Sequence, residues 1–141
     1  MSNVSTSESD GMPRWASIDH VQVAIPVGSE DAARRFYSGV LGLPEVPKPA
    51  VMAARGGAWF EAGPVRLHVG AEDPFVPARK AHPALTMFGL RAYVEASELD
   101  VTWNDELPGV ARCHVFDPFG NRIELIEAGD VSGAGESQGA S

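Results

Sequence analysis

Four residues that can bind a metal ion recur at related places in this sequence. They are His20, His68, His82 and Glu124. Three imidazoles and one carboxylate form a donor set suited to Zn, Ni, Mn, Fe or Co. Two histidines and one carboxylate can also hold Fe(II) or Mn(II) and leave positions open for a substrate. A metal ion with an open position acts as a Lewis acid on a substrate oxygen, so this set indicates metal-assisted chemistry.

Each of the four residues lies in a segment that has the pattern of a β-strand. Side chains of a strand point alternately to its two faces. His20 is followed by Val21, and Glu124 stands between Ile123 and Leu125. The apolar residues therefore occupy the face opposite each metal-capable residue. A sheet that packs on helices through its apolar face would present all four side chains on its other face.

The elements that position these residues are predicted in the same order twice. Ser29 is a suitable N-cap for a first helix, and Gly42 a suitable stop. Residues 90–99 have the spacing of a second, shorter helix. Strands are predicted at 18–25, 58–61 and 65–69 in the first half, and at 82–87, 101–103, 111–116 and 122–126 in the second.

The residue types also repeat between the two halves, in addition to the order of the predicted elements. The segment 66–69, Arg-Leu-His-Val, matches 122–125, Arg-Ile-Glu-Leu, at an offset of 56 residues. Phe60-Glu61 and Phe116-Asp117 precede the two segments at the same offset, and the first strands, at His20 and His82, are 62 residues apart. These matches predict an internal duplication.

Three segments resemble the vicinal-oxygen-chelate superfamily, which includes glyoxalase I, extradiol dioxygenases and bleomycin-binding proteins. They are Ile18-Asp-His-Val, Phe36-Tyr-Ser-Gly-Val-Leu-Gly-Leu and Asp117-Pro-Phe-Gly-Asn-Arg-Ile-Glu-Leu-Ile. The resemblance covers about 18–127. It implies an α+β fold of two tandem βαβββ modules, which form a curved, mixed eight-stranded sheet with a cleft and with helices on the outer face. We expect one domain at 16–127, with module one at about 16–72 and module two at about 80–127, and disordered tails at 1–15 and 128–141.

The resemblance also implies roles for the four residues. His20, His82 and Glu124 match the two-histidine, one-glutamate metal site that is frequent in the superfamily. His68 occupies the variable fourth position, where it is either a fourth ligand or an acid/base beside the metal. Glu124 and His68 are the expected catalytic residues.

Four further residues are candidates for binding substrate. Arg66 and Arg122 share the face of the metal-capable residues and can receive an anionic group, although a surface ion pair explains an arginine equally well. Trp59 and Trp103 can line a pocket for an apolar group, or belong to the core or a dimer contact.

Composition excludes several classes of function. The 141 residues carry 11 Lys and Arg against 19 Asp and Glu, a formal net charge of -8. This balance argues against nucleic-acid and polybasic membrane partners, and no apolar run approaches the ~20 residues of a membrane span. Cys113 is the single cysteine, which rules out an intrachain disulfide or a cysteine-based zinc cluster. With no signal peptide evident, we expect a cytoplasmic protein.

The sequence therefore predicts a glyoxalase-like metalloenzyme that catalyses proton transfer, isomerisation or lyase chemistry on a small oxygenated substrate. Two alternatives stay open: an Fe(II) extradiol-type dioxygenase and a non-catalytic drug-binding protein of the bleomycin-resistance type. The expected partners are the small-molecule substrate and a second copy of the chain in a homodimer, because the exposed edges of a sheet this small need cover.

Overall fold

The structure, a computed structural model, describes residues 11–129, so most of both predicted tails lies outside the described residues. The order strand, helix, three strands occurs twice, as the family resemblance implies, although the pattern of the sequence did not predict the strand at 45–46. The first half contains β1 (Val21–Pro26), α2 (Glu30–Ala33), a π-helical segment (Arg34–Val40), β2 (Glu45–Val46), α3 (Ala50–Ala53), β3 (Ala58–Ala62) and β4 (Val65–Glu72). The second contains β5 (Ala84–Met87), α4 (Leu90–Ser97), β6 (Thr102–Asn104), β7 (Arg112–Phe116) and β8 (Arg122–Glu127).

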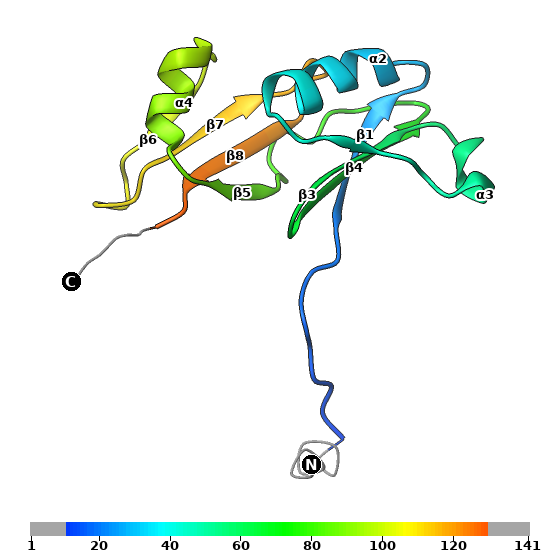
Figure 1. Cartoon of the computed structure of the whole chain (residues 1–141), viewed down its shortest axis with the longest axis horizontal. Coiled ribbons are helices and arrows are strands. Elements are labelled where there is room, and N and C mark those ends of the chain that lie inside the picture. The colour runs from blue at the N-terminus through cyan, green and yellow to red at the C-terminus, as the bar shows by residue number, and fades with distance from the viewer. Residues whose placement is uncertain (1–10, 130–141) are drawn as a thin grey trace.

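The strands form two four-stranded sheets of identical topology, in the orders β1-β4-β3-β2 and β5-β8-β7-β6. In each sheet the first strand is parallel to the last one, and the other pairs are antiparallel. The two sheets lie side by side, with α2, the π-helical segment and α4 on the same side of them (Figure 1). The predicted α+β fold of two βαβββ modules is thus confirmed. We call the sheet face opposite these helices the open face.

The register of the strands shows how far the duplication extends. Gln22 pairs with His68 in β4, and Ala84 pairs with Glu124 in β8, so His20 and His82 each stand two residues before an equivalent position. The match of Phe60 with Phe116 was wrong. Phe60 pairs with Leu67, whereas Phe116 pairs with Arg122, because the turn between β7 and β8 is one residue longer than the turn between β3 and β4.

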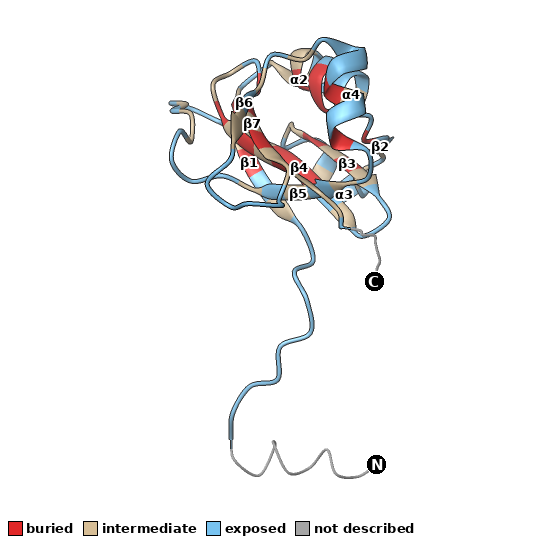
Figure 2. Cartoon of the chain, turned by 90° about the vertical axis from the view of Figure 1, so that its left-hand side faces the viewer, coloured by how far each residue is buried: buried red, intermediate tan, exposed pale blue. Residues whose placement is uncertain are grey.

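The core fills the space between the sheets and the helices, where the buried residues gather (Figure 2). The predicted first helix is present, but most of it is wider than an α-helix, since the Leu41 N–H bonds to the Phe36 carbonyl five residues back. Gly42 ends it with a φ of 74°, a left-handed conformation that suits glycine. Tyr37 on this segment is fully buried.

A polar connection ties the two modules together at the turn between β7 and β8. The Asn121 amide donates to the Ala24 carbonyl of β1 at 2.8 Å and to Asp117 Oδ2 at 2.9 Å, and its oxygen accepts from the Ala78 N–H at 2.9 Å. The Tyr37 hydroxyl donates to the same Asp117 carboxylate at 2.7 Å. Gly120 in this turn has a left-handed conformation, with a φ of 95°, which suits glycine.

Residues 11–20 extend away from the sheets as an arm without helix or strand (Figure 1). Three large apolar residues of this arm are exposed, namely Met12, Trp15 and Ile18. His20 lies where the arm joins β1. None of the helices in residues 11–129 has the length and apolar character needed to cross a bilayer.

Candidate metal centre

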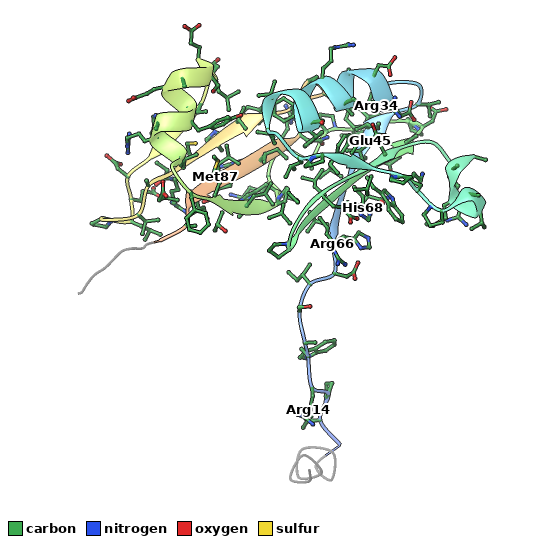
Figure 3. The ribbon with its side chains drawn as sticks, viewed as in Figure 1. Arg14, Arg34, Glu45, Arg66, His68 and Met87 are labelled. Atoms are coloured by element: carbon green, nitrogen blue, oxygen red, sulfur yellow. The ribbon has the colours of Figure 1, made fainter. Side chains whose placement is uncertain are left out.

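The first pair of predicted ligands, His20 and His68, lies on the open face of module one. Their rings stack with centroids 4.3 Å apart, and Trp59 stacks on the other side of His68, also at 4.3 Å. His68 is 4% exposed, and its Nε2 lies 2.8 Å from the Glu61 carboxylate. Figure 3 shows His68 and Arg66 on the side of the sheet away from α2. This part of the site is packed in place by its neighbours.

The second pair, His82 and Glu124, occupies the equivalent place in module two. His82 Nε2 lies 2.9 Å from Glu124 Oε1. The other carboxylate oxygen of Glu124 accepts a hydrogen bond from Arg112 Nη1, also at 2.9 Å. Since the side chain of Glu124 is only 15% exposed, this ion pair fixes its orientation.

The hydrogen bonds determine which ring nitrogens can bind a cation. His82 Nδ1 must donate, because its partner at 2.9 Å is the Lys80 carbonyl oxygen. By the same reasoning His20 Nδ1 donates to Asp19, and His68 Nε2 donates to Glu61. Each neutral ring then keeps one nitrogen with a free lone pair. Metal-ligating histidines in proteins have this arrangement, in which the second ring nitrogen donates to an oxygen.

His82 and Glu124 provide the clearest test of whether the residues fit a metal ion. The Nε2 lone pair of neutral His82 faces a carboxylate oxygen, so two acceptors meet at 2.9 Å. This arrangement is favourable only with a cation between or beside them, either a proton on the ring or a bound metal ion. The donor set of this pair therefore fits a divalent cation.

The structure brings the four predicted ligands together in two pairs and not in one cluster. Within residues 11–129, no three His, Cys, Asp or Glu side chains lie close enough to share a metal ion. In addition, the stacked rings of His20 and His68 are inclined by only 18°, so their in-plane lone pairs do not converge. One of these rings must turn if both are to bind one ion, and His20, at the end of the arm, is the more exposed. The assignment of all four as ligands stays a prediction.

The other predicted site residues lie in different surroundings. Trp59 is on the open face, against His68. Arg66 is exposed and pairs with the exposed Asp19 at 3.1 Å. Trp103 does not join them: it pairs with buried Cys113, packs against the core and lies under the Arg91 guanidinium of α4.

Arg122 lines a cavity of about 220 Å³ beside the second pair. His82 and Glu124 also line it, as does His114 of β7, which faces Glu124 across the two strands. Burial, and then the positive charge of Arg122, lower the pKa of His114. The imidazole of His114 is therefore neutral in this cavity at physiological pH.

Sequence reasoning missed two residues that orient the site, Arg112 and Glu61. Both lie on the open face of the strand next to the ligand that they contact. Alternation along the strand could have placed both on the open face, because Arg112 stands two residues before His114 and Glu61 stands two residues after Trp59. Pairing them with Glu124 and His68 requires the register between neighbouring strands, which the sequence does not state.

Comparison with known proteins identifies relatives among solved structures, while no protein-family model and no curated protein matches the chain. A protein from Bacillus anthracis, assigned to the glyoxalase family, is 42% identical, with 82% of this chain and 98% of that chain covered and a TM-score of 0.79.

Two more distant structures show the same fold. Lactoylglutathione lyase from Agrobacterium tumefaciens is 21% identical, with 82% and 96% covered and a TM-score of 0.59. A fosfomycin resistance protein from Listeria monocytogenes is 10% identical, with 83% and 97% covered and a TM-score of 0.61. Together with the paired βαβββ modules, the 42% identical relative shows that this chain belongs to the glyoxalase family, within the vicinal-oxygen-chelate superfamily.

Proposed function

We propose that this protein is a metal-dependent enzyme of the glyoxalase type, which moves a proton within a small oxygenated substrate in an isomerisation or lyase reaction. His20, His68, His82 and Glu124 would hold a divalent ion. When bound, such an ion supplies Lewis-acid chemistry toward substrate oxygens. The observation that carries the proposal is the contact between His82 Nε2 and Glu124 Oε1, which lie 2.9 Å apart, so that a proton or a metal ion must lie between or beside them.

The residues of the chain have separate tasks in this proposal. Arg112 holds Oε2 of Glu124, so only Oε1 is directed toward the ion and the substrate. His68 is sandwiched between two rings and bonded to Glu61 through Nε2, which leaves Nδ1 to bind the ion or to accept a proton. The buried position of His68 limits access of bulk water to this proton acceptor.

We further propose that the protein is a homodimer in which each metal site takes residues from both copies. Two observations support this arrangement. The His20–His68 pair and the His82–Glu124 pair lie apart within one described chain. The arm at residues 11–20, which ends in His20, exposes Met12, Trp15 and Ile18 to solvent, and a second copy would bury these side chains.

Metal analysis tests the first part of the proposal. Protein purified without chelator should contain one divalent ion per chain, and His82→Ala or Glu124→Gln should lower that content to background. His114→Ala is the matched control, because His114 lines the same cavity but is outside the ligand set. A metal-free wild-type protein that also takes up no Zn, Ni, Mn, Fe or Co on dialysis would contradict the proposal.

Mixing two inactive variants tests the shared site. If the site spans two copies, subunit exchange between His20→Ala and Glu124→Gln proteins creates a heterodimer with one intact site, so metal binding returns in the mixture. If all ligands belong to one chain, no intact site forms and the mixture stays empty. Light scattering that gives the mass of a monomer, 14.9 kDa, would exclude the dimer.

Activity assays then separate the reaction types. We expect the metal-loaded protein to convert a methylglyoxal–thiol adduct and to show no oxygen uptake with catechols under reducing conditions. Oxygen uptake would instead favour the extradiol alternative, and heat on titration with bleomycin-type compounds without any turnover would favour the drug-binding one.

A further inference from the structure

Two arginine side chains line the cavity of about 220 Å³ beside Glu124. Arg112 belongs to β7 and Arg122 to β8, the two neighbouring strands of module two. In each of them the Nε atom is buried and has no hydrogen-bond partner within residues 11–129. A buried N–H donor without an acceptor is unfavourable, so this cavity lacks an acceptor that a ligand can provide.

The two arginines differ in their ion pairs. Arg112 lies 2.9 Å from Glu124 and 3.8 Å from Glu106. In contrast, no carboxylate of the described residues forms an ion pair or a hydrogen bond with the side chain of Arg122; its backbone N–H bonds to the Ala78 carbonyl. Arg122 is thus a half-buried guanidinium whose charge no described side chain neutralises.

The charges of the cavity indicate that it fits an anion. Arg112 and Glu124 pair with each other, and Glu106 is 79% exposed, so solvent screens its charge. The positive charge of Arg122 then remains, and an ion bound by His82 and Glu124 would add to it. A carboxylate compensates the charge of Arg122 in the metal-free and in the metal-bound protein.

The shape of the guanidinium and the size of the cavity indicate which class of anion would bind. A planar carboxylate matches the fork of a guanidinium, which binds it through two parallel hydrogen bonds. A volume of 220 Å³ corresponds to about seven water-sized groups, which suits a small molecule.

We propose that Arg122 anchors a carboxylate group of a small substrate in this cavity. The inference rests on the proposed function, since it names the substrate class of the same site. The substrate oxygens that face Glu124 and His82 would then be bonded to carbon atoms next to that carboxylate.

The test uses the full chain, freed of metal by a chelator, with propionate as the probe and NMR titration as the readout. Propionate should shift the Arg122 Nε–H signal, and uncharged propionamide, which has nearly the same shape, should not. Arg122→Gln should weaken propionate binding by about ten-fold or more. Arg122→Lys should bind propionate with an affinity between those of the wild type and Arg122→Gln, because lysine keeps the positive charge but lacks the guanidinium fork.

Arg35→Gln is the control, since Arg35 is exposed on the π-helical segment, and it should bind propionate like the wild type. Urea unfolding of each variant shows whether it is folded. Unchanged propionate binding in folded Arg122→Gln protein, or tighter binding of dianionic methylphosphonate, would overturn the proposal. Because neither the probe nor the protein carries a metal, failure of the metal proposal does not affect this result.

Discussion

Asn121 is expected to be the most important polar side chain for the stability of this fold. Its amide makes three hydrogen bonds, to β1, to residue 78 and to Asp117, while the residue is only 1% exposed. Asn121→Ala removes all three bonds and leaves buried backbone and carboxylate groups without these partners. At ~1 kcal/mol for each neutral bond and ~2 kcal/mol for the bond to the charged Asp117, the loss is about 4 kcal/mol.

Such a loss is a large part of the ~5–15 kcal/mol that stabilises an ordinary domain. Guanidinium chloride unfolding, followed by far-ultraviolet circular dichroism, measures it directly. Asn104→Ala is the control, because both hydrogen bonds of the Asn104 side chain go to Glu106, two residues away on the surface. Asn104→Ala should lower the free energy of unfolding by less than ~1 kcal/mol.

A second substitution separates the lost bonds from the lost volume. Asn121→Asp keeps an oxygen for the Ala78 N–H but replaces the donor that faces Asp117 with an acceptor. It should therefore destabilise the protein at neutral pH at least as much as alanine does. If Asn121→Ala loses less than ~1 kcal/mol, the connection between the modules is not held by these hydrogen bonds, and the reasoning is refuted.

Three further predictions concern other contacts. Burial and the negative charge of Asp117 raise the pKa of Tyr37 above its ordinary value of 10.0, so the folded state favours the neutral phenol and its stabilisation falls as pH rises above 10. Tyr37→Phe should lower the free energy of unfolding by about 1–2 kcal/mol at pH 7, and urea titrations up to pH 11 should show this difference shrinking; a constant difference would contradict the assignment. The Glu127 carboxylate accepts the Gly89 and Leu90 N–H groups at the start of α4, so Glu127→Ala should destabilise the protein by about 1–2 kcal/mol in thermal melts, and Glu127→Gln by less. Trp59 stacks on His68, so zinc should change the intrinsic fluorescence of the wild type and not that of Trp59→Phe; an equal change in both would place the ion elsewhere.

Much of the fold could be predicted from local patterns. The strand around Glu124 and the helix at residues 90–99 are found within two residues of their predicted bounds, because alternation and helical spacing are properties of neighbouring residues. The parity of His68 likewise placed it on the open face. Phe60 and Phe116 are not structurally equivalent, because one extra residue in the second turn changes the register. The sequence pattern does not show where such a residue is inserted.

The site shows the same limit. Its candidate ligands could be found as residue types at equivalent positions, but their partners could not. Arg112 reaches Glu124 diagonally across the β7–β8 pair, and Asn121 reaches Ala24 across 97 residues of sequence. Neither contact has a local signature, since each depends on strand register or on the packing of one module against the other.

The sequence by itself determined the order of most of the elements and the face on which His68 and Glu124 lie, because both follow from periodicity along a single strand or helix. His20 and His82 were predicted within strands but stand just before β1 and β5. Only the tertiary structure decided which ring nitrogens keep a free lone pair and that His20 with His68 and His82 with Glu124 form separate pairs. It also decided that no side chain among residues 11–129 forms an ion pair with Arg122. The physical reason is that hydrogen bonds and ion pairs act over a few ångströms. They are therefore fixed only when the sheets and modules have packed.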